Sequence, residues 1–124
     1  MAGDRMKVGE VADRLGLSVR TLRHYEDIDL VAPTARTEGN FRLYTEDDVR
    51  RLLIIRRMKP LGYSLDEMRT FLRAVDALHG SDNPDPAALT VIDEVRADAR
   101  NRYERLLTHV EYATEFIGIL DDLD

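Results

Sequence analysis

The sequence GLSVRTLRHYE, at residues 16–26, decides how the N-terminal part of this chain folds. Upstream, residues 7–15 carry apolar side chains at helical spacing, and Gly16 is placed to end that helix in a left-handed conformation. Ser18 is a good N-cap for a second helix that should extend to about Asp27. Two short helices joined by a glycine turn, the second basic and aromatic, form the layout of a helix-turn-helix that contacts a DNA groove.

Residues 28–44 do not follow a helical pattern and predict a two-stranded wing. Pro33 stops any continuing helix, and TEGN at residues 37–40 has the composition of a turn. The segment ends in FRLY, residues 41–44, which suits a short strand. Arginines flank the turn on both sides, and their charge suits contact with the backbone or minor groove of adjacent DNA.

Two further helices are expected after the wing. Thr45 and an acidic first turn open a third helix, predicted to be the central core helix, and Pro60 with Gly62 should end it. Ser64 and Glu67 form a capping box for a fourth helix. The expected buried stripe of this fourth helix is Leu65, Met68, Phe71, Leu72 and Val75.

A long C-terminal helix should follow a linker at residues 79–85. Asp85 and Pro86 place a cap before a proline at the first helical position. Residues 86–120 then contain no helix breaker except Gly118, over a length of about 52 Å. A heptad frame fits, and nine of its ten seam positions are apolar or aromatic, which predicts a coiled coil. The seam is Leu89, Ile92, Arg96, Ala99, Tyr103, Leu106, Val110, Ala113, Ile117 and Leu120.

The seam is too long for the rest of one chain to cover, so a second copy is its expected partner. A hairpin within one chain is the alternative, but Gly118 lies too near the end to make that turn. Arg96 interrupts the seam. Either it pairs with an acidic residue of the partner and fixes the register, or the coil splays at that end.

Composition excludes several classes of protein. The chain has no cysteine, which excludes thiolate zinc sites, iron–sulfur clusters and disulfides, and its three histidines are too scattered for a metal site. No metal or cofactor is therefore expected, and no nucleophile–base pair or phosphate-binding loop indicates an enzyme. No apolar run could span a membrane and no signal peptide is visible, so a cytoplasmic, nucleoid-associated protein is expected.

The net charge of −6 is distributed unevenly. Residues 1–74 hold 14 Lys and Arg against 12 Asp and Glu, for a net of +2. Residues 75–124 hold 4 against 12, for a net of −8. This asymmetry indicates that residues 1–74 face nucleic acid and that residues 75–124 have another role.

Two ordered motifs extend over some 65 residues, VGEVADRLGLSVRTLRHYEDIDL at 8–30 and GNFRLYTEDDVRRLLIIRRMKPLGYSLDEM at 39–68. Together they resemble the MerR family of bacterial transcription regulators. The resemblance implies a winged helix-turn-helix domain, a linking helix pair and an antiparallel coiled-coil homodimer. It also implies binding to a palindrome in double-stranded DNA between widely spaced promoter elements. The dimer would bend and untwist this DNA so that RNA polymerase engages both elements, and some members repress.

The expected fold class is therefore mainly α, in three parts. A winged helix-turn-helix DNA-binding domain with its linking helices covers residues 6–78, a linker covers 79–85, and a dimerisation helix covers 86–120. Three departures from the family's usual pattern occur. His24-Tyr25 replaces two tyrosines, Asp29 replaces a glycine, and Asn40-Phe41 replaces a glycine and a tyrosine. Asn40 can still adopt a left-handed turn conformation.

Candidate DNA contacts are drawn from the second helix, the wing and the end of the third helix. Arg20 is the expected base contact, since arginine pairs bidentately with guanine, with a phosphate contact or a solvated charge as the alternative. Arg23 reaches a phosphate or pairs with Asp27. Tyr44 is expected mainly in the wing core, with an incidental hydroxyl contact. The full candidate set is Ser18, Arg20, Thr21, Arg23, His24, Tyr25, Arg36, Asn40, Phe41, Arg42, Tyr44, Arg57 and Lys59.

The leading functional hypothesis is a dimeric, sequence-specific transcription regulator. An excisionase-like or architectural DNA-binding accessory protein is the alternative, but the long acidic helix favours the regulator. Two hypotheses about regulation remain open. A small organic effector binds near Tyr103, Tyr112 or Phe116, whose rings would otherwise be ordinary packing, or protein abundance alone sets the response.

Overall fold

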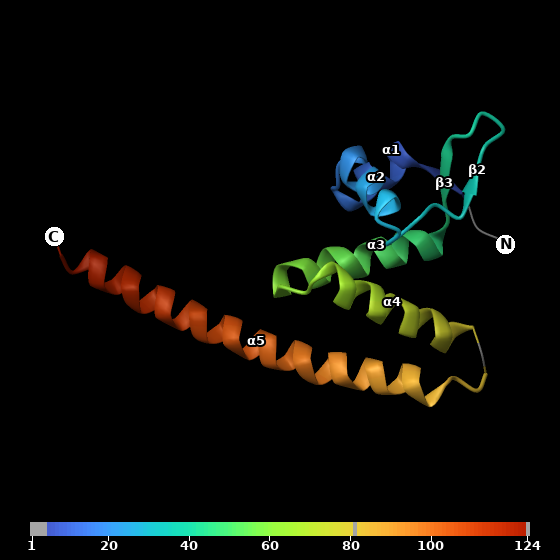
Figure 1. Ribbon diagram of the computed structural model, residues 1–124. Helices are drawn as coiled ribbons and strands as arrows, with labels where there is room; N and C mark the ends of the chain where they lie inside the picture. Colours follow the sequence, from blue (N-terminus) through green and yellow to red (C-terminus); the bar gives the residue numbers. More distant parts are fainter. Residues whose placement is uncertain (1–4, 81, 124) are drawn as a thin grey trace. The chain divides into compact units, whose positions relative to one another are not determined.

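The computed structural model describes residues 5–80 and 82–123, and the chain is mainly helical (Figure 1). It forms two compact units, the first ending at Leu72 and the second beginning at Arg73. The boundary between the two units lies inside helix α4 (Leu65–His79).

The first unit begins with the predicted helix pair, α1 (Val8–Leu15) and α2 (Val19–Asp27). Gly16 has φ 66° and ends α1 in the left-handed conformation, as predicted. The Ser18 hydroxyl accepts a hydrogen bond from the Thr21 N–H at 3.0 Å, which confirms the predicted N-cap. Val11 and Leu22 are buried where the two helices pack together.

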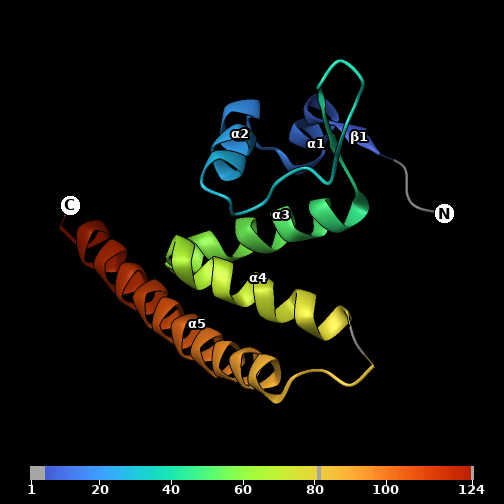
Figure 2. The same ribbon diagram turned by 45° about the vertical axis from the view of Figure 1, so that its right-hand side comes forward.

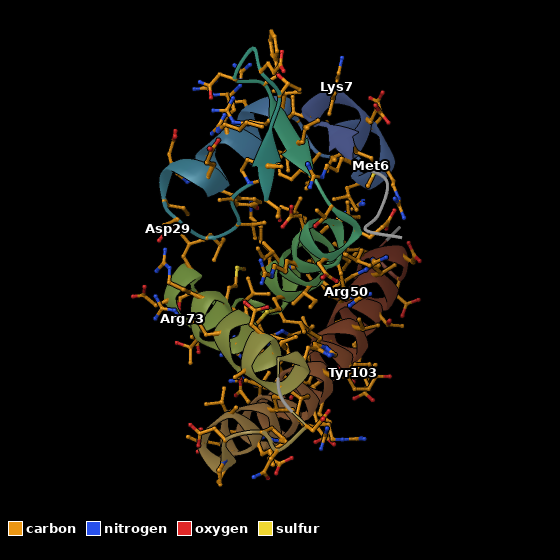
Figure 3. The ribbon with its side chains drawn as sticks, turned by 90° about the vertical axis from the view of Figure 1, so that its right-hand side faces the viewer. Met6, Lys7, Asp29, Arg50, Arg73 and Tyr103 are labelled. Carbon is orange, nitrogen blue, oxygen red and sulfur yellow. The ribbon has the colours of Figure 1, made fainter. Side chains whose placement is uncertain are left out.

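The chain leaves α2 through a tight turn with a left-handed residue. The Leu30 N–H donates to the Tyr25 carbonyl at 2.9 Å, and Asp29 has φ 57°. Asp29 is exposed and lies on this turn, beyond the end of α2 (Figure 3). Left-handed backbone disfavours residues with a Cβ atom, although Asp tolerates it better than most.

Replacing Asp29 by glycine is expected to stabilise the first unit. Relief of the left-handed strain exceeds the extra chain entropy of glycine, so Asp29→Gly should raise the free energy of unfolding by about 0.5 kcal/mol and Tm by about 3 °C. Asp27→Gly is the matched control, because Asp27 is helical and glycine there should lower Tm. Thermal unfolding followed by circular dichroism measures both, and an unchanged or lower Tm for Asp29→Gly would contradict the strain argument.

The wing belongs to a three-stranded antiparallel sheet with strand order β1-β3-β2, where two strands were predicted. The strands are β1 (Met6–Lys7), β2 (Ala35–Arg36) and β3 (Arg42–Tyr44). Strand β1 was missed because two residues are too few for a periodic pattern. β1 pairs with the edge of β3 that β2 leaves open, and this pairing joins residues that are far apart in the sequence.

The β2–β3 hairpin stands out from helices α1 and α2 (Figure 2). Its turn is closed by the Thr37 N–H donating to the Phe41 carbonyl at 2.9 Å. Asn40 has φ 65°, which confirms the expected left-handed conformation. A Cβ atom on Gly39 would lie 3.1 Å from the ring of Phe41, so glycine lets this ring lie close against the turn.

Helix α3 (Glu46–Met58) is the central helix of the first unit, as predicted, and buries Leu52 and Ile55 completely. A short 3-10 turn (Lys59–Leu61) follows, and Gly62 ends it in the left-handed conformation. Thr45 caps α3 in a capping box with Asp48.

Asp48 is fully buried, which the sequence analysis did not predict. Its Oδ2 atom accepts hydrogen bonds from the Thr34 N–H at 3.0 Å, the Thr34 hydroxyl at 2.7 Å and the Thr45 N–H at 3.0 Å. One carboxylate oxygen therefore ties the segment that enters the wing to the start of α3.

Helix α4 begins with the predicted capping box. The Ser64 N–H donates to Glu67 Oε1 at 2.8 Å, and the Glu67 N–H donates to the Ser64 hydroxyl at 3.1 Å. Met68 and Leu72 are buried and Phe71 and Val75 are half-buried, but Leu65 is exposed, so its place in the predicted stripe was wrong. Leu65 lies in the first turn of α4, and only the later turns of the helix bury side chains.

Helix α5 (Pro86–Asp121) extends one residue beyond its predicted end. The Asp85 carboxylate accepts a hydrogen bond from the Ala87 N–H at 3.0 Å, and Pro86 occupies the first turn, as expected. Its 36 residues correspond to about 54 Å. Among the described residues, no helix is both long enough and apolar enough to cross a membrane.

Candidate nucleic-acid interface

The outward face of α2 carries exposed basic side chains. Arg20, Arg23 and His24 are exposed, and Thr21 is half-exposed. Within the described parts of the chain neither arginine has an ion-pair partner, so the alternative pairing of Arg23 with Asp27 is not made. These side chains are available for an anion outside the protein.

Ser18 and Thr21 serve first as a helix cap. Their hydroxyls share a hydrogen bond of 2.8 Å, in addition to the bond from the Thr21 N–H to the Ser18 hydroxyl. Both side chains retain exposed surface at the start of α2. A contact with DNA would therefore use the remaining hydrogen-bonding capacity of these hydroxyls.

Tyr44 is wholly buried, as its expected place in the wing core requires, and only the incidental hydroxyl contact with DNA is corrected. Its hydroxyl is inaccessible and has no hydrogen-bond partner among the described residues, and burial raises the pKa of Tyr44. It is a packing residue of the sheet. Tyr25 is also buried, with 6% of its surface exposed, and burial raises its pKa as well. The expected buried ring is confirmed, and only a small part of Tyr25 faces solvent.

The wing presents one exposed ring and two arginines that share a carboxylate. Phe41 has 69% of its surface exposed, on the hairpin turn beside Asn40. Arg36 and Arg42 both donate to Glu26 of α2. The pKa of Arg42 is raised, first by its hydrogen bond to Glu26. The sequence predicted both arginines but not this shared partner.

Three basic side chains lie at the end of α3, Arg56, Arg57 and Lys59, and they differ in role. The Arg56 guanidinium donates to the carbonyl of Leu15, at the end of α1, so it joins two helices. Arg57 and Lys59 are exposed, and no ion pair involves them in the described part of the chain. These two remain candidates for phosphate contact.

Lys7 is a candidate that the sequence analysis missed. It is exposed on β1, directly opposite Leu43 of β3, and its side chain points away from the ribbon beside the wing (Figure 3). The available signal was the apolar Met6 followed by the charged Lys7 immediately before the first helix. Among residues 5–80 and 82–123, no group of three or more His, Cys, Asp or Glu side chains is placed to hold a metal ion.

Comparison with known sequences identifies the family to which this arrangement belongs. Residues 6–75 match the sequence model described as MerR HTH family regulatory protein, and residues 49–109 match the one described as MerR, DNA binding. The chain belongs to the MerR family. This confirms the resemblance found in the sequence.

Curated relatives of this MerR family chain match more than half of it. The mercuric resistance operon regulatory protein of Bacillus cereus is 39% identical over 72 residues, which cover 58% of this chain and 54% of the relative. Nodulation protein NolA of Bradyrhizobium elkanii is 40% identical over 74 residues, which cover 60% of this chain and 34% of the relative. The chain thus spans between about a third and a half of the length of these relatives.

Solved structures of MerR family proteins match nearly the whole chain. The N-terminal part of the Bacillus subtilis multidrug transporter activator, MtaN, is 31% identical with a TM-score of 0.60, covering 94% of each chain. A MerR family regulator from Bacillus cereus is 27% identical with a TM-score of 0.68, covering 96% of this chain and 79% of that chain. HiNmlR, a MerR family regulator bound to promoter DNA, is 21% identical with a TM-score of 0.66, covering 95% and 86%, and shares the fold.

The predicted seam of α5 lies on the surface of this single MerR family chain. Tyr103 projects outward from the helix (Figure 3), and most apolar seam positions beyond it are exposed. Arg96 Nη1 donates to Asp93 Oδ1 at 3.1 Å on the same helix, so its charge already has a partner without a second chain. The aromatic side chains Tyr112 and Phe116 are exposed too.

Proposed function

We propose that this chain is a dimeric, sequence-specific DNA-binding regulator of transcription that acts in the cytoplasm on nucleoid DNA and has no enzymatic activity. The observation that carries the proposal is the set of exposed arginines on α2, which have no ion-pair partner among the described residues, beside a projecting wing in a chain of the MerR family. The recognition helix enters the major groove, and the wing contacts the neighbouring backbone. Residues 6–78 form the DNA-binding domain in this proposal.

Dimerisation through residues 86–120 gives the protein its second DNA-contacting unit. The exposed apolar seam of α5 calls for a partner, and a second copy supplies an identical seam. Two recognition helices then bind the two halves of a palindrome. In the family's mode of action, the dimer distorts the DNA between the promoter elements so that RNA polymerase engages both elements. HiNmlR, which has the same fold, was solved bound to promoter DNA.

Regulation by a small organic ligand and regulation by abundance alone predict different behaviour of the purified protein. The exposed rings of Tyr103, Tyr112 and Phe116 offer apolar surface for an organic molecule. The alternative role of the same rings is ordinary packing. DNA binding by ligand-free protein, with transcription unaffected by added compounds, would favour abundance.

Footprinting of the purified protein on the DNA upstream of its own gene, across a salt series, tests the proposal. Protection of a palindrome between promoter elements is expected, with affinity falling steeply as salt rises, because bound arginines displace counterions from phosphates. Protection away from any promoter would instead support an accessory protein of the excisionase type. Absence of protection at every site tested would contradict sequence-specific binding by the ligand-free protein.

Arg20→Ala is expected to weaken binding to the protected site by about 1–3 kcal/mol per half-site and to relax base preference at one position. The reason is loss of a bidentate contact to guanine. Arg50→Ala is the matched control, since Arg50 is exposed on α3 and pairs with Asp47 at 3.3 Å. Electrophoretic mobility shift with single-base operator variants measures both. Uniform weakening on every variant would assign Arg20 to a phosphate.

A further inference from the structure

Glu26 of α2 is the carboxylate to which both wing arginines bind. Its Oε2 atom accepts from Arg36 Nη2, and its Oε1 atom accepts from Arg42 Nε. Only 16% of the Glu26 side chain is exposed. We call Glu26, Arg36 and Arg42 the wing cluster.

The wing cluster offsets a repulsion that the sheet creates. Arg36 and Arg42 lie directly opposite each other on β2 and β3. Like charges at such paired positions destabilise a two-stranded ribbon. One carboxylate between two guanidinium groups removes most of this repulsion and leaves a net charge of +1. It also attaches the hairpin to the recognition helix.

The two arginines use different atoms in the wing cluster. Arg36 donates to Glu26 through Nη2 and to the Asn40 carbonyl through Nη1 at 3.3 Å, so each of its terminal nitrogens already makes one hydrogen bond. Arg42 donates to Glu26 only through Nε. In the part of the chain that the structure describes, its two terminal nitrogens make no hydrogen bond. A guanidinium held at Nε can still bind a phosphate through its terminal N–H groups.

We propose that Glu26 is a positioning residue that gives the two wing arginines separate roles. Arg36 fixes the hairpin to α2, and Arg42, oriented through Nε, presents its terminal nitrogens to a phosphate of the bound duplex. This assignment rests on the DNA-binding function proposed above. It explains why an acidic residue lies next to the wing cations of a DNA-binding protein, where charge alone would disfavour it.

Two variants that remove the same charge from the same hairpin test the separation of roles. The probe is a duplex of random sequence, and the measurement is the slope of log affinity against log salt. Arg42→Ala should reduce the magnitude of this slope by about 0.9 for each copy of Arg42 on the DNA, whereas Arg36→Ala should leave it nearly unchanged. Equal reductions by the two variants would overturn the assignment.

Conservative variants test whether orientation matters beyond charge. Arg42→Lys keeps the charge but cannot donate to Glu26 and bind a phosphate bidentately, so it should lose affinity for the protected site although its charge is unchanged. Glu26→Gln removes a negative charge and should strengthen binding to the random duplex. It should also lower the ratio of site affinity to random-duplex affinity several-fold. An unchanged ratio would make Glu26 a repulsive charge only and would overturn its positioning role.

A measurement without DNA separates failure of this assignment from failure of the proposed function. A double-mutant cycle on Tm with Glu26→Gln and Arg36→Ala should show coupling between the two changes, and additive losses would overturn the fixing of the hairpin. Wild-type protein that binds neither duplex would overturn the proposed function and the role of Arg42 with it. The cycle would still decide whether Arg36 fixes the hairpin.

Discussion

Leu106→Asp is expected to convert the protein to monomers and to abolish stable binding to a palindromic site. Leu106 lies at the centre of the predicted seam of α5 and has 43% of its surface exposed in the single chain. In a dimer it would be buried against the partner, where an unpaired carboxylate costs several kcal/mol. We expect the dissociation constant of the dimer to rise about a thousandfold, corresponding to about 4 kcal/mol. Sedimentation velocity measures the change directly.

The neighbouring Leu107 provides a matched control for this variant. It has 46% of its surface exposed but lies outside the heptad seam. Leu107→Asp should therefore leave the dimer largely intact. A dimer that survives Leu106→Asp, or that is lost equally in both variants, would show that the seam is assigned incorrectly. Loss of DNA binding should follow loss of the dimer, since one half-site alone offers a small interface.

Asp48→Ala is expected to produce the largest loss of stability in the first unit. The change removes an acceptor shared by three donors, the Thr34 N–H, the Thr34 hydroxyl and the Thr45 N–H. These three hydrogen bonds are part-buried, and losing their common acceptor destabilises the folded state, so the free energy of unfolding should fall by about 3 kcal/mol. Tm should fall by more than about 10 °C in thermal unfolding.

Two further variants show whether the loss comes from the buried acceptor. Asp47→Ala changes the adjacent, exposed aspartate in the same acidic first turn and should have little effect. Asp48→Asn keeps an oxygen that can face the three donors, so its effect should be clearly smaller than that of Asp48→Ala. Similar losses in Asp47→Ala and Asp48→Ala would attribute the effect to the charge of the first turn and not to the hydrogen bonds.

Helix ends were the most predictable part of this fold. Gly16, Ser18, Thr45 and the Ser64–Glu67 pair act within three or four residues of their own positions, so their roles follow from local sequence. The long helix after Asp85 could be predicted for the same reason. The family could also be predicted, because ordered motifs in the sequence identify it. Most of the candidate cations on α2 and the wing could be named because they lie within these motifs.

Contacts between distant segments could not be predicted in this way. Strand β1 exists through its pairing with β3, and the burial of Tyr44 depends on the sheet that this pairing completes. Asp48 resembles an ordinary first-turn acid until Thr34 is brought beside it. Glu26 lies ten residues from Arg36 and sixteen from Arg42, so nothing local marks it as their shared partner.

The length of α5 has a consequence for how long each molecule survives in a cell. Much of its apolar seam is exposed in the single chain, so in the proposed dimer the stability of the helix would depend on the concentration of protomers. At low copy number, unpaired helices would open locally and become substrates for proteases. Newly made chains would then be degraded quickly until enough accumulate to pair. The protein's own turnover would set a threshold below which few functional dimers persist.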